Sequence, residues 1–269
     1  MDLLKAILIA IVEGLTEYLP VSSTAHMIFT SSFFGIQEDD FVKLFQVSIQ
    51  FGAILAVVFL YWKKFFDFTK INFYIKLACA VMPALVLGKL FDDKIEAVLE
   101  KPVPIAIVLI VGGIVLLFID NFFKNSTITK EEDISIKKAV TIGFWQCLAM
   151  MPGTSRSAAS IIGGMQQGLT RHTAAEFSFF LAVPTMMAVT CYSVFLKTYE
   201  HTQMKGYELI LQSQDTITMF LVGNVVAFIV AVLAIKFFIG IIKQYGFKPW
   251  GWYRIIAGTL LLIYFSVIK

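Results

Sequence analysis

The stretch EGLTEYLPVSSTAH, residues 13–26, decides how this chain folds, because it places two acids, a proline, hydroxyls and a histidine inside an apolar segment. A second polar stretch, PGTSRSAAS at 152–160, carries an arginine. Ionisable groups are costly in hydrocarbon, so their presence in apolar segments marks a candidate functional site. We therefore expect the protein to act where these two stretches meet.

The rest of the chain has the composition of a polytopic membrane protein. Of its 269 residues, 58% are hydrophobic and 15% charged, and the mean hydropathy of +0.79 is too high for a soluble domain. We expect one integral membrane domain over residues 1–269. The first 20 residues resemble a signal peptide but contain two glutamates and lack a small-residue cleavage site, so we interpret them as mature structure. The net charge of +3 is small and dispersed, which excludes a nucleic-acid footprint.

Six apolar segments are long enough, or nearly so, to cross a bilayer at about 20 residues each. Two further apolar segments, 6–35 and 139–169, are broken halfway by PVSS at 20–23 and PGTS at 152–155. Each half is about 14 residues, too short to span alone, which favours re-entrant helix pairs. The predicted spans are 45–62, 72–91, 104–122, 177–196, 216–238 and 252–268.

The two broken segments resemble each other, which indicates an internal repeat. A shift of 133 positions aligns seven identical residues among 30. The identical pairs are Ala6 with Ala139, Ile9 with Ile142, Leu15 with Leu148, Ser22 with Ser155, Ala25 with Ala158, Ile28 with Ile161, and Gly35 with Gly168. We interpret residues of about 6–123 and 139–268 as two copies, each consisting of one broken pair and three spans.

An odd number of crossings per copy requires the second copy to be inverted, and the loop charges test this requirement. One set of loops holds 12 Lys and Arg residues, and the other holds six, with more acids than bases. The first set is 63–76, 124–138 and 236–254, and the second is 37–43, 89–101 and 197–215. By the positive-inside rule the first set is cytoplasmic. Both termini then lie outside, and the two broken tips enter from opposite faces and meet near the midplane.

Glu13 and Glu17 are four residues apart, so on a helix both carboxylates share one face. Such a pair is tolerated in apolar surroundings if a divalent cation bridges it or if one member keeps a proton. The alternative is that the first helix lies at the membrane interface and both acids are solvated.

Ser22 or Ser23 is placed to cap the helix after the proline, and His26 follows on the same face. A hydroxyl and an imidazole one turn apart can form a nucleophile and its base, or a phosphate donor and a general acid. The alternative is plain capping beside a buried histidine. His172 and His201 lie near loop ends without such neighbours, and we exclude them from the site.

In the second break, Gly153 permits a tight turn, Ser155 can cap, and Arg156 lies in the first turn of the next helix. Hydroxyls, backbone N–H groups and a guanidinium at a helix N-terminus form an anion site that suits phosphate. An arginine at this depth needs an anionic partner, which is either Glu13 or Glu17 in a structural ion pair, or a bound phosphate. Three further polar residues in apolar segments are interpreted as interhelical hydrogen-bonding groups around the site: Gln50, Gln146 and Glu176.

The sequences EGLTEYLPVSSTAHM, FQVSIQFGAILAV and PGTSRSAASIIGGM resemble the undecaprenyl-diphosphate phosphatase family of the bacitracin-resistance type. The resemblance extends over essentially the whole chain. It implies two inverted repeats with re-entrant helices, and removal of the terminal phosphate of undecaprenyl diphosphate. It also implies a divalent cation, Mg²⁺ or Ca²⁺, and an active site that opens to the outer face of the bacterial inner membrane.

Carried onto this chain, the first family motif falls on Glu13, Glu17, Ser22, Ser23 and His26. The second falls on Gly153, Ser155 and Arg156, with Thr154 between them. Our mechanistic hypothesis assigns catalysis to Glu13, Glu17, Ser23, His26 and Arg156, the cation to the two glutamates, and substrate binding to Ser22 and residues 153–156. The attacking group is either Ser23 or a cation-bound water, and His26 moves the proton. Two departures, Ala25 for a frequent glycine and Ser160 for a frequent threonine, remove no functional group.

On these grounds we expect an all-α membrane phosphatase that hydrolyses undecaprenyl diphosphate to undecaprenyl phosphate. Its expected partners are a polyprenyl diphosphate lipid and the bilayer, with no nucleic acid, and a homodimer is the commonest default assembly. Inverted repeats with broken helices are also typical of secondary transporters, so the alternative is a transporter or flippase of a phosphorylated lipid.

Overall fold

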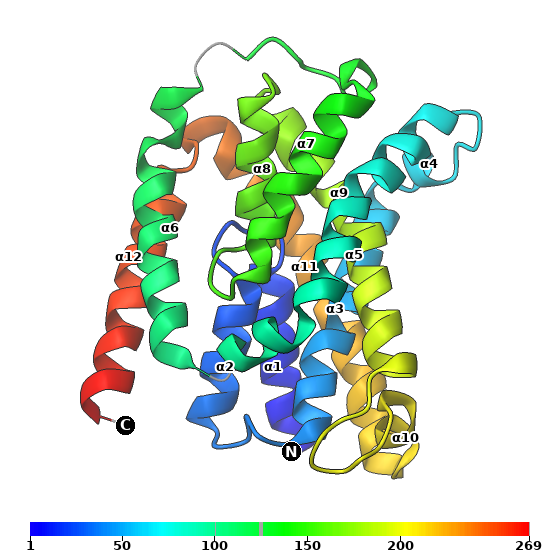
Figure 1. The fold of residues 1–269 in the computed structure, drawn as a ribbon, viewed down its shortest axis with the longest axis vertical. Coiled ribbons are helices and arrows are strands. Elements are labelled where there is room, and N and C mark those ends of the chain that lie inside the picture. The colour runs from blue at the N-terminus through cyan, green and yellow to red at the C-terminus, as the bar shows by residue number, and fades with distance from the viewer. Residues whose placement is uncertain (100, 124–125, 269) are drawn as a thin grey trace.

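The computed structural model describes the backbone of residues 1–99, 101–123 and 126–268, and these residues fold into helices joined by short connections (Figure 1). This part of the chain contains two isolated β-bridges and no strand. Residues 100, 124 and 125, which belong to two of the predicted loops, and residue 269 lie outside the described residues. The elements are α1 (Leu3–Thr16), α2 (Ser23–Phe33), α3 (Asp40–Leu60), α4 (Trp62–Phe65), α5 (Ile71–Leu99), α6 (Pro102–Phe122), η1 (Glu131–Asp133), α7 (Ile136–Gln146), η2 (Cys147–Met150), α8 (Arg156–Gln166), α9 (Arg171–Cys191), η3 (Tyr192–Leu196), α10 (Gly206–Leu211), α11 (Gln214–Tyr245), α12 (Lys248–Ile263) and η4 (Tyr264–Ile268).

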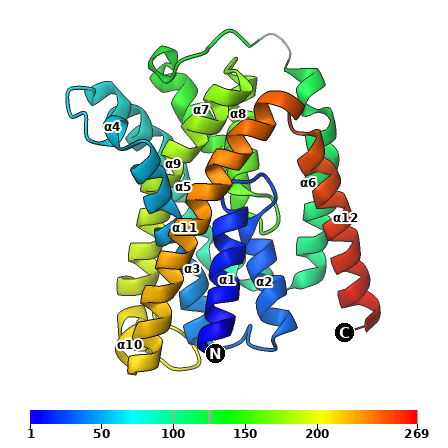
Figure 2. The ribbon, with the colours of Figure 1, turned by 180° about the vertical axis from the view of Figure 1, so that it is seen from behind.

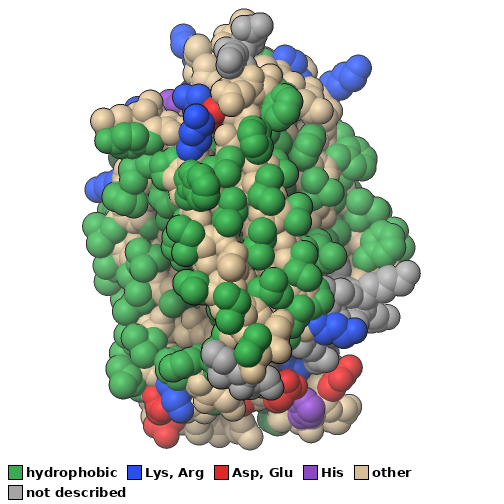
Figure 3. Space-filling model, turned by 90° about the vertical axis from the view of Figure 1, so that its left-hand side faces the viewer, with side chains coloured by type: hydrophobic (Ala, Val, Ile, Leu, Met, Phe, Trp, Pro, Cys, Tyr) green, Lys and Arg blue, Asp and Glu red, His purple; other side chains and the backbone are tan. Residues whose placement is uncertain are grey.

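Six of these helices are long and apolar enough to cross a membrane, which confirms the six predicted spans and the all-α fold class. They are Asp40–Leu60, Ile71–Phe91, Pro102–Phe122, Arg171–Leu196, Gln214–Tyr245 and Lys248–Val267. Figure 3 shows hydrophobic side chains over the middle of one face of the molecule and charged side chains gathered towards its two ends. This distribution suits a molecule surrounded by lipid along its middle.

Several helices begin earlier or end later than the apolar runs predicted. Two of them begin with polar turns that a side chain caps: Asp39 accepts from the N–H of Phe41, and Thr170 accepts from the N–H of Thr173. The predicted loop at 89–101 is helical as far as Leu99, because no glycine or proline follows Gly88 there to stop α5. The predicted loop at 236–254 is also largely helical, since α11 continues to Tyr245 and α12 begins at Lys248.

The two broken segments form helical hairpins with the same local turn. Ser22 precedes α2 with a φ of 71°, and Ser155 precedes α8 with a φ of 75°. Positive φ is uncommon in residues other than glycine, and only Gln203 shares it among the other non-glycine residues described. Each serine hydroxyl accepts a hydrogen bond from the N–H three residues later, at 3.5 Å for Ser22 and 3.3 Å for Ser155. Each break is therefore a sharp turn followed at once by a capped helix.

The hairpins enter the bundle from opposite ends. Figures 1 and 2 show α1 rising from the end that holds both termini and α2 returning to it, whereas α7 and α8 extend from the other end. The connections after α3, α6 and α11 lie at that other end, and those after α2, α5 and α9 lie at the terminal end. Each of the two loop sets distinguished by charge therefore lies at one end of the molecule.

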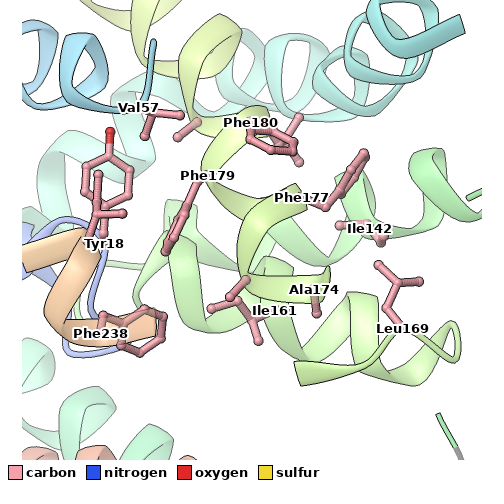
Figure 4. Packing of buried hydrophobic residues seen from close by; sticks show 14 of the residues in the cluster. Tyr18, Val57, Ile142, Ile161, Leu169, Ala174, Phe177, Phe179, Phe180 and Phe238 are labelled. Carbon is pink, nitrogen blue, oxygen red and sulfur yellow. The ribbon is translucent and has the colours of Figure 1, made fainter. Parts of the chain in front are cut away.

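An aromatic core on α9 holds the first tip in place (Figure 4). Phe179 and Phe180 are fully buried. The ring of Tyr18 meets Phe179 edge to face, with centroids 5.1 Å apart, and its hydroxyl donates to the carbonyl of Ala53 at 2.9 Å. Because edge-to-face aromatic pairs prefer one geometry, this packing fixes the chain next to Glu17.

Candidate active site

Glu13 and Glu17 project from the last turns of α1 into the protein interior. Their exposed fractions are 0% and 5%, so the alternative of two solvated acids at the membrane interface is wrong. α1 lies against α11 at Gly14, where an added Cβ would come within 2.7 Å of the carbonyl oxygen of Ala227. This close approach of two helices leaves the acidic face of α1 turned towards the tips rather than towards lipid.

Glu17 connects the two hairpins through its two carboxylate oxygens. One oxygen accepts a hydrogen bond of 2.5 Å from the hydroxyl of Ser23, and the other pairs with Nη2 of Arg156 at 2.7 Å. The sequence left open whether Glu13 or Glu17 would pair with the arginine, and the structure selects Glu17. Ser23, Glu17 and Arg156 thus form one buried chain of contacts.

Arg156 is held by α9 as well as by Glu17. Its Nη1 donates to the carbonyl of Ser178 at 2.9 Å and lies 3.3 Å from the hydroxyl of the same residue. Its guanidinium carbon lies 5.7 Å from the ring centroid of Tyr18, and its Nε has no hydrogen-bond partner. The hydroxyl of Ser160 donates to the Arg156 carbonyl at 2.9 Å and pairs with the Ser178 hydroxyl at 2.7 Å. The guanidinium is therefore fixed at the N-terminus of α8.

The second tip is a tight turn with no room for a side chain at its glycine. Gly153 has a φ of 93°, and a Cβ there would lie 2.7 Å from the carbonyl oxygen of Ile105. Thr154 follows it, half-buried, and Ser155 caps α8. The Ser157 hydroxyl donates to the carbonyl of Leu19 at 2.9 Å, which joins this tip to the first one. In the first turn of α8 the N–H of Ala158 donates to Ser155, and the N–H groups before it have no acceptor within the helix and suit an anion.

His26 lies one turn into α2, and its ring nitrogens are both engaged. Nδ1 is 2.7 Å from the carbonyl oxygen of Ser22, and Nε2 is 2.8 Å from the hydroxyl of Tyr253. The pairing of a serine hydroxyl with this imidazole, considered from the sequence, is not among the described contacts, because Ser23 donates to Glu17 instead. The turn at Ser22 directs the Ser23 side chain back towards α1.

Two residues of α12, Tyr253 and Arg254, belong to the site although the sequence reasoning missed them. Arg254 is fully buried and was assigned to a cytoplasmic loop. Its guanidinium donates at 2.7 to 3.4 Å to five main-chain carbonyls. They belong to Pro20, Val108, Leu109, Gly153 and Thr154. Arg254 therefore ties both tips to α6.

Two sequence signals accompany Arg254. Gly112 faces it on α6, where a Cβ would lie 2.2 Å from its Nη2. Two features of the sequence together would have identified Arg254. One is an arginine six residues after the start of a span, and the other is a Gly-Gly pair in another span. When Arg254 is no longer counted as a loop residue, the first loop set still holds more Lys and Arg residues than the second.

Of the surrounding polar residues, Gln146 makes the interhelical hydrogen bond expected of it, donating to the hydroxyl of Thr185 at 3.1 Å. Gln50 is buried on α3. Glu176 pairs within α9 with His172 at 3.7 Å. These residues lie around the chain of contacts without joining it.

The carboxylates of α1 fit a divalent cation. Both oxygens of Glu13 are buried without a hydrogen-bond partner. Within the described residues, no three His, Cys, Asp or Glu side chains gather as a complete metal site. Mg²⁺, however, is commonly held by one or two carboxylates together with substrate phosphates. Glu13 provides one carboxylate with free oxygens beside the anion site, and Glu17 would provide the second where a bound phosphate takes over Arg156.

Comparison with known proteins places the chain in a family. The family described as bacitracin resistance protein BacA matches residues 6–260. The undecaprenyl-diphosphatase of Flavobacterium psychrophilum is 54% identical over 268 residues, which cover 99% of this chain and 98% of the relative. Relatives of the same name from Porphyromonas gingivalis and Acetivibrio thermocellus are 48% and 40% identical, over 98% and 100% of this chain and 96% and 100% of the relatives. The chain therefore belongs to the bacitracin resistance protein BacA family.

Proposed function

We propose that this protein hydrolyses undecaprenyl diphosphate to undecaprenyl phosphate and inorganic phosphate. This reaction recycles the lipid carrier of peptidoglycan synthesis and confers bacitracin resistance. The family match and the name of the relatives support it. The observation that carries it is the buried chain from Ser23 through Glu17 to Arg156, which places a hydroxyl, its proton acceptor and an anion-binding cation between membrane-spanning helices. The comparisons do not favour the alternative of a transporter or flippase.

In the first step, the Ser23 oxygen attacks the terminal phosphorus, and the bond from phosphorus to the bridging oxygen breaks. Undecaprenyl phosphate leaves with the electron pair, and the Ser23 proton passes to Glu17, whose oxygen lies 2.5 Å away. In the second step a water molecule takes the place of the Tyr253 hydroxyl at Nε2 of His26 and attacks the phosphoserine. His26 accepts the proton of this water and releases it to the solvent after the phosphate has left. Ser23 regains a proton from Glu17 as inorganic phosphate departs.

The second tip holds the diphosphate. Arg156 provides positive charge, Ser155 and Thr154 provide hydroxyls, and Gly153 provides a backbone N–H, whereas the N–H of Thr154 already donates to the carbonyl of Met151. Ser22 borders the same space from the first tip. Oxygen atoms of the phosphate compete with Glu17 for the guanidinium, so substrate binding loosens the ion pair. A divalent cation, Mg²⁺ or Ca²⁺, would be held by Glu13 and Glu17 and would offset the charge of the phosphates.

We further propose that the chain is an inverted repeat of about 6–123 and 139–268. Two observations support it: the hairpins enter from opposite ends, and the aligned Ser22 and Ser155 share an uncommon backbone conformation. With the basic loop set in the cytoplasm, the first hairpin and both termini face outwards, and the site opens to the outer face of the inner membrane. A homodimer is the assembly we expect.

The decisive experiment measures phosphate release from undecaprenyl diphosphate by purified protein in detergent, with and without a chelator. Detergent removes the two sides of the membrane, so a pure transporter releases no phosphate. We expect release by the native protein, loss with the chelator, and a fall of about 10²-fold or more in Arg156→Ala. His172→Ala, which changes a histidine outside the site, keeps near-native activity.

Labelled substrate with rapid quenching tests the nucleophile. We expect a transient phosphoserine in the native protein and none in Ser23→Ala, which loses activity. Absence of label together with an active Ser23→Ala would assign the attack to water.

A further inference from the structure

Tyr253 contacts His26 from the opposite end of the chain. Its hydroxyl lies 2.8 Å from Nε2 of the imidazole, and the two rings are stacked, with centroids 5.7 Å apart and planes 15° apart. Tyr253 is on α12, 227 residues along the chain, and its exposed fraction is 44%. The two residues therefore meet through their rings as well as through the hydrogen bond.

The contact with Ser22 determines which nitrogen of His26 carries the proton. A carbonyl oxygen only accepts hydrogen bonds, so Nδ1, at 2.7 Å from the Ser22 carbonyl, is the donor. Nε2 of the neutral ring therefore presents its lone pair to Tyr253. His26 is ready to accept a proton at Nε2 and at no other position.

A hydroxyl at Nε2 suits both states of the imidazole. It donates to the lone pair of the neutral ring, and it accepts from the N–H of the protonated ring. Arg254, the charged neighbour of Tyr253 on α12, directs its guanidinium to the carbonyls of both tips and not to the histidine. Tyr253 is thus the partner that keeps the ring in one orientation while its charge changes.

We propose that Tyr253 is a positioning residue for His26. Its hydroxyl holds the ring, whose tautomer the Ser22 carbonyl sets, in one orientation, and it yields Nε2 to the water whose proton His26 accepts during phosphate release. The proposal rests on the role of His26 proposed above. It predicts that the hydroxyl affects turnover and not substrate affinity, because Tyr253 acts through the imidazole rather than on the diphosphate.

The test is a double-mutant cycle between Tyr253→Phe and His26→Asn, with kcat and KM measured for undecaprenyl diphosphate. Tyr253→Phe keeps the stacked ring and removes only the hydroxyl, so the fold is preserved. We expect its kcat to fall about tenfold with an unchanged KM. In the His26→Asn background the same change should alter kcat by less than about twofold.

Tyr264→Phe is the matched control, because this tyrosine is also at the C-terminal end of the chain and its ring packs on Phe265, with centroids 5.0 Å apart. It should match the native protein. A native kcat in Tyr253→Phe, or an equal fall in both backgrounds, would overturn the proposal. Full activity in His26→Asn would also overturn the proposal, because His26 would then have no role in turnover. The proposed reaction would still hold in that case, provided that the native protein releases phosphate.

Discussion

Glu17 uses each of its carboxylate oxygens for a different half of the site. One receives the Ser23 hydroxyl within the first hairpin, and the other receives Arg156 from the second. Both members of the ion pair are buried, and a buried pair is costly to break, because removing one partner leaves an unpaired charge in the interior. The buried Arg156 charge therefore needs Glu17 for stability, and the same carboxylate takes part in the proposed reaction.

Glu17→Gln should separate these two contributions. The amide keeps the size of the side chain but leaves Arg156 unpaired, so we expect a loss of about 3–5 kcal/mol of stability and no measurable turnover. The double variant Glu17→Gln with Arg156→Met should regain most of the stability and none of the activity. Thermal unfolding in detergent and phosphate release measure the two quantities, and a double variant as unstable as the single one would contradict the argument.

Sequence reasoning identified the members of this cluster but not their pairings. Charge in an apolar chain indicated Glu13, Glu17 and Arg156, and helical spacing indicated His26 with Ser22 or Ser23. The bond from Ser23 to Glu17 depends on the direction of the turn at Ser22, which composition does not encode. The partner of His26 lies 227 residues away, and only the packing of α12 brings it near.

At the scale of elements, the two breaks are held by capped turns. Ser22 and Ser155 combine a positive φ with a side chain that caps the next helix. The sequence predicted the breaks and the caps from proline, glycine and serine, but not the backbone conformation. The predicted spans are shorter than α5 and α11, because each helix continues through polar turns beyond the apolar run from which the span was predicted.

Substitutions at Ser155 should reveal both features of the turn. Ser155→Ala loses the cap and keeps a Cβ at a φ of 75°, so we expect a loss of about 1–2 kcal/mol. Ser155→Gly relieves the backbone and should cost only a few tenths, about 0.3 kcal/mol. Unfolding midpoints in one detergent compare the two variants, and an alanine variant more stable than the glycine variant would exclude this explanation.

A substitution at Gly112 on α6 should disturb the tips of both hairpins through Arg254 on α12. Gly112→Ala places a methyl group where Nη2 of Arg254 now lies, so the guanidinium must leave some of its carbonyl acceptors. We expect a loss of about 1–3 kcal/mol from overpacking and reduced turnover, although Gly112 contacts neither glutamate nor phosphate site. Gly240→Ala is the control, since a Cβ there meets nothing within 4 Å, and it should retain stability and activity.

At the scale of the whole molecule, the two hairpins bring polar residues to mid-height from opposite ends. The apolar band between the charged ends (Figure 3) fixes the axis of the molecule in a membrane but not its direction. Direction depends on the loops, where one set is basic and the other acidic. The proposed outward opening of the site therefore rests on charge alone, and it has its own test.

Cysteine labelling in intact cells tests this orientation. The chain has three cysteines, so the starting variant replaces Cys79, Cys147 and Cys191 by alanine. A cysteine introduced at Glu38, in the acidic set, should react with a membrane-impermeant maleimide in intact spheroplasts. One introduced at Asp67, among the basic residues at the other end, should react only after lysis. Because α1 begins and α2 ends at the Glu38 end of the molecule, the reverse labelling would place the first hairpin on the cytoplasmic side and contradict the proposed orientation.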